Sequence, residues 1–334
     1  MKNPWLFFFA ALLSMTAPRI DRAQSQVTTI ILGHSGGAGL VSDLRRVIER
    51  DRIWEKYGLN VKAVYFNSGS VLTQAMAGGN IVVSDSDVPA MLNLSISGVA
   101  DVKLVAVTIN HLEHIVVVRK NVMKPEDLKG KRLAVSGFGS LGDFLERYII
   151  RKYGMEPGRD VVMLSVGTQP ERIQALMSGA VDAADLSFPA DVQAERKGFK
   201  VLWDAKQEVS YPSMSVVMRR KSVTDDRDTV MRMVKAHVEA IHYLKANKDF
   251  SMKVLGKYLK TNDRELLEGS YEIYRKDFIP VPYPITQGLQ PTYEYVALQR
   301  PDVWNHKLEE FMDPSFIAEL EKTGFIAGLS KSGR

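Results

Sequence analysis

Residues 132–142 read RLAVSGFGSLG, a short apolar strand followed by a glycine-rich loop and the start of a helical run. The glycines at positions 137, 139 and 142 match the G-x-G-x-x-G pattern of dinucleotide-binding proteins. Glycine lets backbone N–H groups approach a ligand, and the amino terminus of the following helix favours an anion. The stretch therefore predicts a strand, loop and helix that face a polar or anionic group.

A dinucleotide site also needs an acidic residue at the end of the next strand, where it binds the ribose. That strand covers residues 161–166 and is followed by Gly167 and Thr168, while the nearest acid, Asp160, precedes it. Because the ribose-binding acid is missing, we expect no nucleotide here. We expect no other cofactor in the chain.

The same order of elements occurs about a hundred residues earlier. A strand, a Ser-Gly turn, a helix and a second strand fill residues 28–66, as they fill residues 132–166. A further helix follows each second strand, and the two helices correspond at an offset of 100, with Asp85 matching Asp185. Strands that alternate with helices predict parallel sheets. Two copies of the pattern predict two similar α/β lobes, each with a mainly parallel sheet flanked by helices.

Two segments are expected to connect these lobes. Residues 110–114 and 209–212 each lie between two strand-like runs, and we expect the chain to cross from one lobe to the other there. The helical segments after residue 230 contain no third copy of the sheet pattern, so they are expected to pack against lobe 1. The predicted boundaries are 26–114 and 216–334 for a discontinuous lobe 1, and 115–215 for lobe 2.

The amino terminus predicts export. Lys2 precedes the apolar run 5–13, and small or polar residues follow it up to Ser25. The run is too short to span a bilayer, so residues 1–25 are expected to be a signal peptide, with an uncleaved membrane anchor as the alternative. The 334 residues include no cysteine, which excludes disulfides and a lipid-modified cysteine. These features predict a non-lipidated periplasmic protein.

The charge balance argues against a nucleic-acid partner. The net charge of +5 falls to +3 without residues 1–25, because that segment holds three basic residues and one acid. A charge this small and dispersed is not typical of a nucleic-acid-binding surface. We expect a monomer that binds a small molecule.

Residues 128–135 (LKGKRLAV) and 174–183 (QALMSGAVDA) resemble two segments of the periplasmic solute-binding proteins of ABC importers. The group concerned is the NMT1-like family, which includes binders of sulfonates, taurine, nitrate and pyrimidine precursors. Residues 186–189 (LSFP) stand where this family has a short aromatic-and-proline element. The resemblance covers roughly residues 27–250. One departure is Val82, which stands where the first lobe of the family usually has Asp.

The resemblance implies a type 2 periplasmic binding protein with a Venus-flytrap mechanism. Two lobes close over a small polar or anionic solute, such as a sulfonate, a carboxylate or a heterocycle, and deliver it to a membrane permease and its ATPase. No catalytic activity is expected. The alternatives are a ligand-sensing domain for a membrane signalling partner, and a metal-dependent enzyme of the pyrimidine-synthesis type. That enzyme relies on a cysteine-rich iron-binding segment, which this chain lacks.

The ligand site is predicted where the parallel strands end and helices begin. The loops there contain small and hydroxyl-bearing residues and no Lys or Arg, so N–H and hydroxyl groups could hold an anion or a neutral polar solute. Ser and Gly at such turns also serve as helix caps and turn formers, and this alternative stays open. The predicted ligand-binding residues are Ser35, Gly36, Gly37, Ser68, Gly69, Ser70, Asp85, Ser86, His114, Phe138, Gly139, Ser140, Gly167, Thr168, Ser187, Phe188 and Tyr211.

Several of these residues have a second interpretation. His111 and His114 form an H-x-x-H pair, but a metal site needs further ligands, so we expect no metal. His114 is expected either to hydrogen-bond the solute or the backbone near the hinge, or to lie on the surface. Asp85 is expected either to bind an amine or to cap the helix that follows it. The aromatic residues at 138, 188 and 211 either line the cleft or pack in a lobe core.

Overall fold

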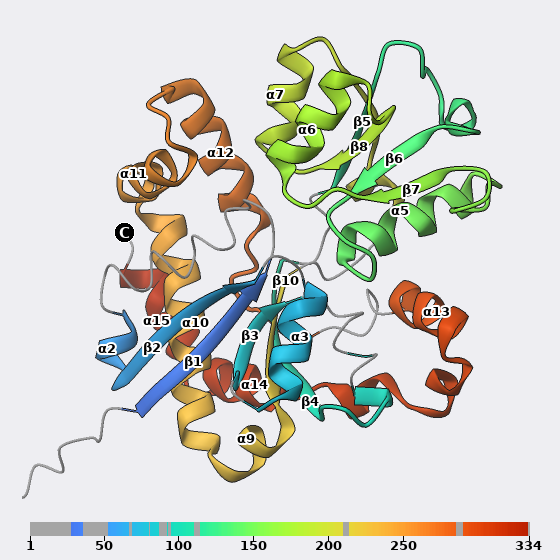
Figure 1. The fold of residues 1–334 in the computed structure, drawn as a ribbon. Coiled ribbons are helices and arrows are strands. Elements are labelled where there is room, and N and C mark those ends of the chain that lie inside the picture. The colour runs from blue at the N-terminus through green and yellow to red at the C-terminus, as the bar shows by residue number, and fades with distance from the viewer. Residues whose placement is uncertain are drawn as a thin grey trace, which may run out of the picture.

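The computed structural model describes residues 28–35, 53–66, 69–79, 81–86, 92, 95–109, 114–209, 214–284 and 290–332. These residues form two five-stranded sheets, each flanked by helices (Figure 1). The strand order is β2-β1-β3-β10-β4 in the first sheet and β7-β6-β8-β5-β9 in the second. The predicted α/β architecture with two lobes is therefore confirmed. We call the first sheet with its helices lobe 1 and the second sheet with its helices lobe 2.

The sheet of lobe 1 is mainly parallel. β1 pairs in parallel with β2 and β3, whereas β10 runs antiparallel to both β3 and β4. Its strands are β1 (Thr28–Ser35), β2 (Leu59–Phe66), β3 (Val83–Ser86), β4 (Val102–Ile109) and β10 (Met214–Arg219).

The sheet of lobe 2 repeats this plan. β6 pairs in parallel with β7 and β8, whereas β5 runs antiparallel to both β8 and β9. Its strands are β5 (Ile115–Val118), β6 (Arg132–Val135), β7 (Val162–Ser165), β8 (Ala183–Leu186) and β9 (Lys200–Asp204). Its helices are η1 (Pro125–Leu128), α5 (Leu141–Lys152), α6 (Gln169–Ser178), α7 (Ala190–Arg196) and α8 (Ala205–Glu208).

The chain crosses between the sheets twice, in the predicted places. β4 lies in lobe 1 and β5 in lobe 2, and β9 lies in lobe 2 and β10 in lobe 1. In each sheet the antiparallel strand, β10 in lobe 1 and β5 in lobe 2, is the one that follows a crossing. The exact domain boundaries stay a prediction.

The carboxyl-terminal helices pack mainly on lobe 1, as expected. In α10 the side chains of Val234, Val238 and Ile241 are buried together with Leu32 of β1 and Val105 of β4. The remaining helices are α2 (Ile53–Lys56), α3 (Gly69–Ala77), α9 (Arg220–Asp225), α10 (Arg227–Ala246), α11 (Lys248–Leu259), α12 (Arg264–Asp277), α13 (Gln290–Gln299), η3 (Pro301–Asn305), η4 (Leu308–Phe311), α14 (Ser315–Lys322) and α15 (Phe325–Ser332). None of the described helices has the length and apolar character needed to cross a membrane.

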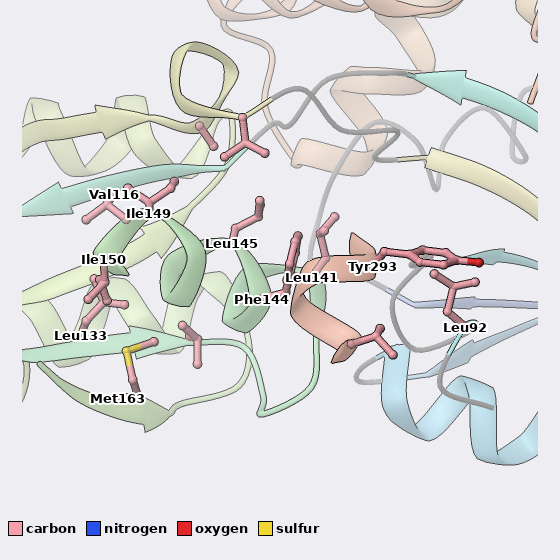
Figure 2. Packing of buried hydrophobic residues seen from close by; sticks show 14 of the residues in the cluster. Leu92, Val116, Leu133, Leu141, Phe144, Leu145, Ile149, Ile150, Met163 and Tyr293 are labelled. Carbon is pink, nitrogen blue, oxygen red and sulfur yellow. The ribbon is translucent and has the colours of Figure 1, made fainter. Parts of the chain in front are cut away.

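One apolar cluster extends through both lobes. It contains Leu92 from lobe 1 together with Leu141 and Phe144 from α5 of lobe 2. Figure 2 shows Tyr293 of α13 lying between Leu92 and the α5 side chains. The lobes therefore share buried apolar surface on the side where α13 lies.

Candidate functional site

The ends of the parallel strands in both lobes lie where the chain crosses between the sheets. β5 begins directly after the first crossing, and its Ile115 pairs with Leu186 at the end of β8. β10 follows the second crossing, and its Ser215 pairs with Ser86 at the end of β3. The carboxyl edges of the two sheets, which are the usual ligand-binding edges of α/β lobes, therefore lie at the lobe junction.

The predicted residues of lobe 1 lie at this edge as far as they are described. Ser35 and Ser86 end β1 and β3, and Gly69 and Ser70 begin α3. Gly36, Gly37, Ser68 and Tyr211 fall outside the described residues.

Asp85 has a histidine neighbour that sequence reasoning missed. It is buried in β3, and its Oδ1 lies 3.4 Å from Nε2 of His237 on α10. The other ring nitrogen of His237 donates to the carbonyl oxygen of Met233 over 3.0 Å, and the indole of Trp54 meets the imidazole edge-on. The helix that Asp85 was expected to cap lies outside the described residues.

The glycine-rich loop of lobe 2 uses its polar groups internally. Ser140 is the N-cap of α5, and its Oγ accepts a hydrogen bond from the backbone N–H of Asp143 at 3.3 Å. The N–H of Gly139, a residue with φ of +79°, donates to the carboxylate of Asp143 over 2.9 Å. Phe138 is 55% exposed, with the guanidinium of Arg147 lying 5.8 Å from its ring centre.

The next two loops of lobe 2 are also hydrogen-bonded within themselves. Thr168 caps α6, and its N–H and hydroxyl donate to the carboxylate of Glu171 over 2.6 and 2.8 Å. Gly167 before it has φ of +87°. The N–H of Ser187 donates to the side-chain oxygen of Gln169, whose amide donates to the Ser187 hydroxyl. Thr168 therefore has the capping role that the sequence left open, and a ligand role for Gly167, Thr168 and Ser187 stays a prediction.

Phe188 connects the lobes. Its ring meets Tyr274 of α12 edge-on, with the ring centres 6.4 Å apart. Two ion pairs lie on the same helix: Lys206 Nζ is 3.1 Å from Asp277 Oδ2, and Arg196 is 3.6 Å from Asp263, the N-cap of α12. We call these three interactions the α12 contact. Figure 1 shows α12 rising from lobe 1 beside lobe 2.

His114 is bound to a carboxylate that the sequence did not reveal. Its Nδ1 lies 2.7 Å from Oδ1 of Asp185, which is fully buried, while the imidazole side chain is 21% exposed. The imidazole is thus partly buried against a carboxylate, and its role in binding the solute stays a prediction. Among the described residues no group of three metal-ligating side chains could hold a metal ion, and His111 lies outside them.

A set of buried polar groups surrounds this pair. Burial, followed by the negative charge of Asp185, raises the pKa of the Glu146 carboxyl well above its ordinary value. Trp203 donates its indole N–H to Glu146 over 3.0 Å, and Arg172 donates to the backbone carbonyl of Asp185 over 2.6 Å. Glu146, Arg172 and Trp203 were not selected from the sequence, because nothing in their spacing indicates that they meet.

A family model described as the NMT1-like family matches residues 46–256. Among curated proteins, a binding protein of Brucella abortus is 28% identical over 219 residues, which are 64% of this chain and 66% of that protein. The matched stretch thus spans just under two thirds of that relative. The taurine-binding periplasmic protein of Escherichia coli is 28% identical over 236 residues, which are 69% of this chain and 71% of that protein.

Solved structures share the fold. The alkanesulfonate-binding protein SsuA from Xanthomonas axonopodis pv. citri, bound to MOPS, superposes with a TM-score of 0.70 at 18% identity. The superposition covers 84% of this chain and 96% of SsuA. The architecture is that of periplasmic binding proteins.

Proposed function

Because the chain belongs to the NMT1-like family, we propose that it is the extracytoplasmic solute-binding subunit of an ABC importer. It captures a small polar or anionic organic solute, such as a sulfonate, a carboxylate or a heterocycle, between the carboxyl edges of its lobes. It then closes over the solute and delivers it to the permease. The resemblance to periplasmic binding proteins, one of them named for taurine, supports this proposal.

One observation carries the proposal. The carboxyl edges of both sheets lie at the two crossings of the chain, so a solute held at one edge is within reach of the other. Two lobes joined by two crossings can rotate about them, which is the geometry of hinge closure around a ligand. The site then forms fully only when the lobes come together.

The α12 contact supports the closing movement. It joins the lobes through one pair of aromatic rings and two partly exposed ion pairs. Exposed ion pairs contribute roughly 0.2–1 kcal/mol each, so such a contact can form and break during a transport cycle. We propose that it forms as the lobes close.

We further propose that the mature protein is a monomer in the periplasm, is not lipidated and has no catalytic activity. Its partners are the permease and ATPase of one importer. The absence of cysteine and the apolar run at residues 5–13 support export without a lipid anchor.

A solute screen tests the proposal. The purified chain without residues 1–25 is mixed with taurine, alkanesulfonates, nitrate, pyrimidines and aromatic acids, and the melting temperature is recorded for each. A true solute at one hundred times its Kd should stabilise the fold by about 2.7 kcal/mol. Small-angle scattering with the same solute should show a smaller radius of gyration. Tight binding without compaction would contradict the closing mechanism.

A further inference from the structure

We infer that a cavity between α11 and α12 is a second binding site, which takes a phosphate-bearing anion. The cavity has a volume of about 520 Å³, and three lysines line it: Lys253, Lys257 and Lys260. None of the residues that line it belongs to either sheet, so the site is separate from the carboxyl edges where the solute is proposed to bind. The inference goes beyond the proposed function and does not depend on it.

The three lysines gather at the carboxyl end of α11. Lys253 and Lys257 are four residues apart and therefore neighbours on the helix surface, and Lys260 is the C-cap. Like charges at this spacing destabilise a helix, and the helix dipole favours a cation only in the last turn, which Lys253 precedes. All three residues are exposed, and none forms an ion pair with the described residues. The stability of α11 therefore does not account for the cluster.

The acids of the two helices leave this positive charge in place. No Asp or Glu is among the described residues that line the cavity. Asp263, the N-cap of α12, lies 3.6 Å from Arg196 of lobe 2. Glu268 lies 3.3 Å from Arg264 and 3.6 Å from Lys248. These two carboxylates are thus paired with other cations, and the cavity favours an anion.

Lys260 has a backbone conformation that is unusual for lysine. Its φ is +51°, and among the described residues it is the only one other than glycine with a positive φ. Glycine is the usual residue at such a helix end, because it adopts this conformation without strain. A lysine that keeps the strain indicates a use for its side chain. The N–H of Thr261 donates to the carbonyl oxygen of Gly256 over 3.0 Å, which holds the loop against α11 and Lys260 at the cavity.

The lining also selects the kind of anion. Each lysine ammonium is a compact charge with three N–H donors, which suits phosphate. A phosphate monoester offers three acceptor oxygens and about 1.5 to 2 negative charges, whereas a carboxylate offers two oxygens and one charge. Met252 and Leu267 give the cavity an apolar wall, and its volume lies within the range of about 300–1,000 Å³ of small-molecule sites. The cavity therefore fits a phosphate ester with an organic body, either a soluble compound or a lipid headgroup.

Glycerol 3-phosphate and phosphatidic acid test the inference, because they carry the same phosphate group in soluble and in lipid form. The full mature chain is titrated calorimetrically with glycerol 3-phosphate and with glycerol. Its binding to phosphatidylcholine vesicles with and without phosphatidic acid is measured by co-sedimentation.

Two triple variants are compared. The test variant combines Lys253→Gln, Lys257→Gln and Lys260→Gln. The control variant removes three exposed lysines outside the cavity by combining Lys120→Gln, Lys129→Gln and Lys322→Gln. Because both lose the same charge, the comparison separates a site from general attraction of anions. The test variant should weaken binding of glycerol 3-phosphate by about 10- to 100-fold, since it loses charge-assisted hydrogen bonds that water and salt partly screen. The control should bind as the wild type does.

Two results would support the inference. Weaker binding of glycerol 3-phosphate by the test variant alone assigns the site to a soluble phosphate ester. Loss of vesicle binding by the test variant alone, with no binding of free glycerol 3-phosphate, assigns it to a lipid headgroup. Lys260→Gly removes one ammonium group together with the backbone strain, so weaker binding by this variant cannot come from misfolding.

Three results would overturn the inference. They are no binding of either phosphate probe, glycerol binding as tight as that of glycerol 3-phosphate, and phosphate binding that persists in the test variant or falls equally in the control. The proposed function would stand in each case, because the solute screen measures binding at the lobe junction separately.

Discussion

Asp85 and Asp185 occupy corresponding places in the two lobes. Asp85 lies on β3, which pairs in parallel with β1, and Asp185 lies on β8, which pairs in parallel with β6. Each lies beside a histidine, at 3.4 Å in lobe 1 and 2.7 Å in lobe 2. His237 comes from α10 and its side chain is only 4% exposed, whereas His114 comes from the first crossing and is 21% exposed. The repeated strand thus places the same acid in both lobes, but the element packed against it decides whether the pair faces the interior or the junction.

Two glycines show a similar difference. A Cβ on Gly33 of β1 would overlap the end of the Leu72 side chain, whereas one on Gly142 would overlap the Asp185 carboxylate. The end of a leucine can rotate away, but the carboxylate is fixed by His114. The close approach in lobe 1 therefore serves packing, and the one in lobe 2 serves the position of a charge.

The largest expected effect tests whether the two lobes unfold together. Phe144 is fully buried in the cluster that also contains Leu92 and Tyr293, so Phe144→Ala should cost about 3–5 kcal/mol of unfolding free energy. Because the cluster includes both lobes, calorimetry should show a single transition at a lower temperature. The control is Phe316→Ala in the core of lobe 1, with a similar cost. A separate early transition of lobe 2 in Phe144→Ala would show that the shared cluster does not couple them.

The next-largest expected effect is the pH dependence of stability that arises from Glu146, a buried acid of lobe 2. The folded state holds the proton of Glu146 more tightly than the unfolded chain does, so wild-type stability falls as the pH rises above the ordinary pKa of 4.5. The loss is about 1.4 kcal/mol per pH unit until the pKa of the folded state is passed. Glu146→Gln keeps an acceptor for Trp203 and should be more stable than the wild type at pH 8, with little difference near pH 4.5.

The matched variant in lobe 1 is Glu239→Gln, which removes the partner of Lys56 at 2.7 Å. It should lower stability by about 1 kcal/mol or less at pH 8. Urea unfolding at several pH values measures both variants. If both variants changed the free energy of unfolding at pH 8 in the same direction, the charge of Glu146 would be stabilised in the fold, contrary to its burial.

The comparison of Gly142 with Gly33 predicts a smaller difference in the free energy of unfolding. Gly142→Ala should cost about 1–3 kcal/mol, because the added methyl group displaces Asp185. Gly33→Ala should cost less, since Leu72 can adjust. Gly269→Ala on α12 is the control: its Cβ would meet no atom within 4 Å, so helix propensity should add about 0.5–1 kcal/mol of stability. Thermal unfolding of the three variants gives the order, and a neutral Gly142→Ala would mean that the Asp185 carboxylate can move aside without cost.

The sequence predicts the sheets better than the site. Hydrophobic alternation and the repeat at an offset of 100 predict the strands and both crossings, because these signals are local. The site could not be found in the same way, since Ser140 and Thr168 are residue types that serve equally as caps and as ligands. The contact of His114 with Asp185 joins residues 71 positions apart, and only tertiary packing brings them together. In the sequence, Asp185 is recognisable only as the residue that matches Asp85 in the repeat.

The smallest expected effect separates contacts within a lobe from contacts between lobes. Lys206→Ala removes the pair with Asp277 that joins lobe 2 to α12, and Lys152→Ala removes a pair with Glu208 inside lobe 2. Each pair contributes roughly 0.2–1 kcal/mol, so neither variant should change the melting temperature of the solute-free protein much. Only Lys206→Ala acts on the closed form, and it should weaken solute binding by up to about fivefold, mainly through faster dissociation. Stopped-flow release of the solute from both variants measures this difference. Equal release rates would mean that the α12 contact is present in the open and closed forms alike, and that closure depends on the solute and the junction residues alone.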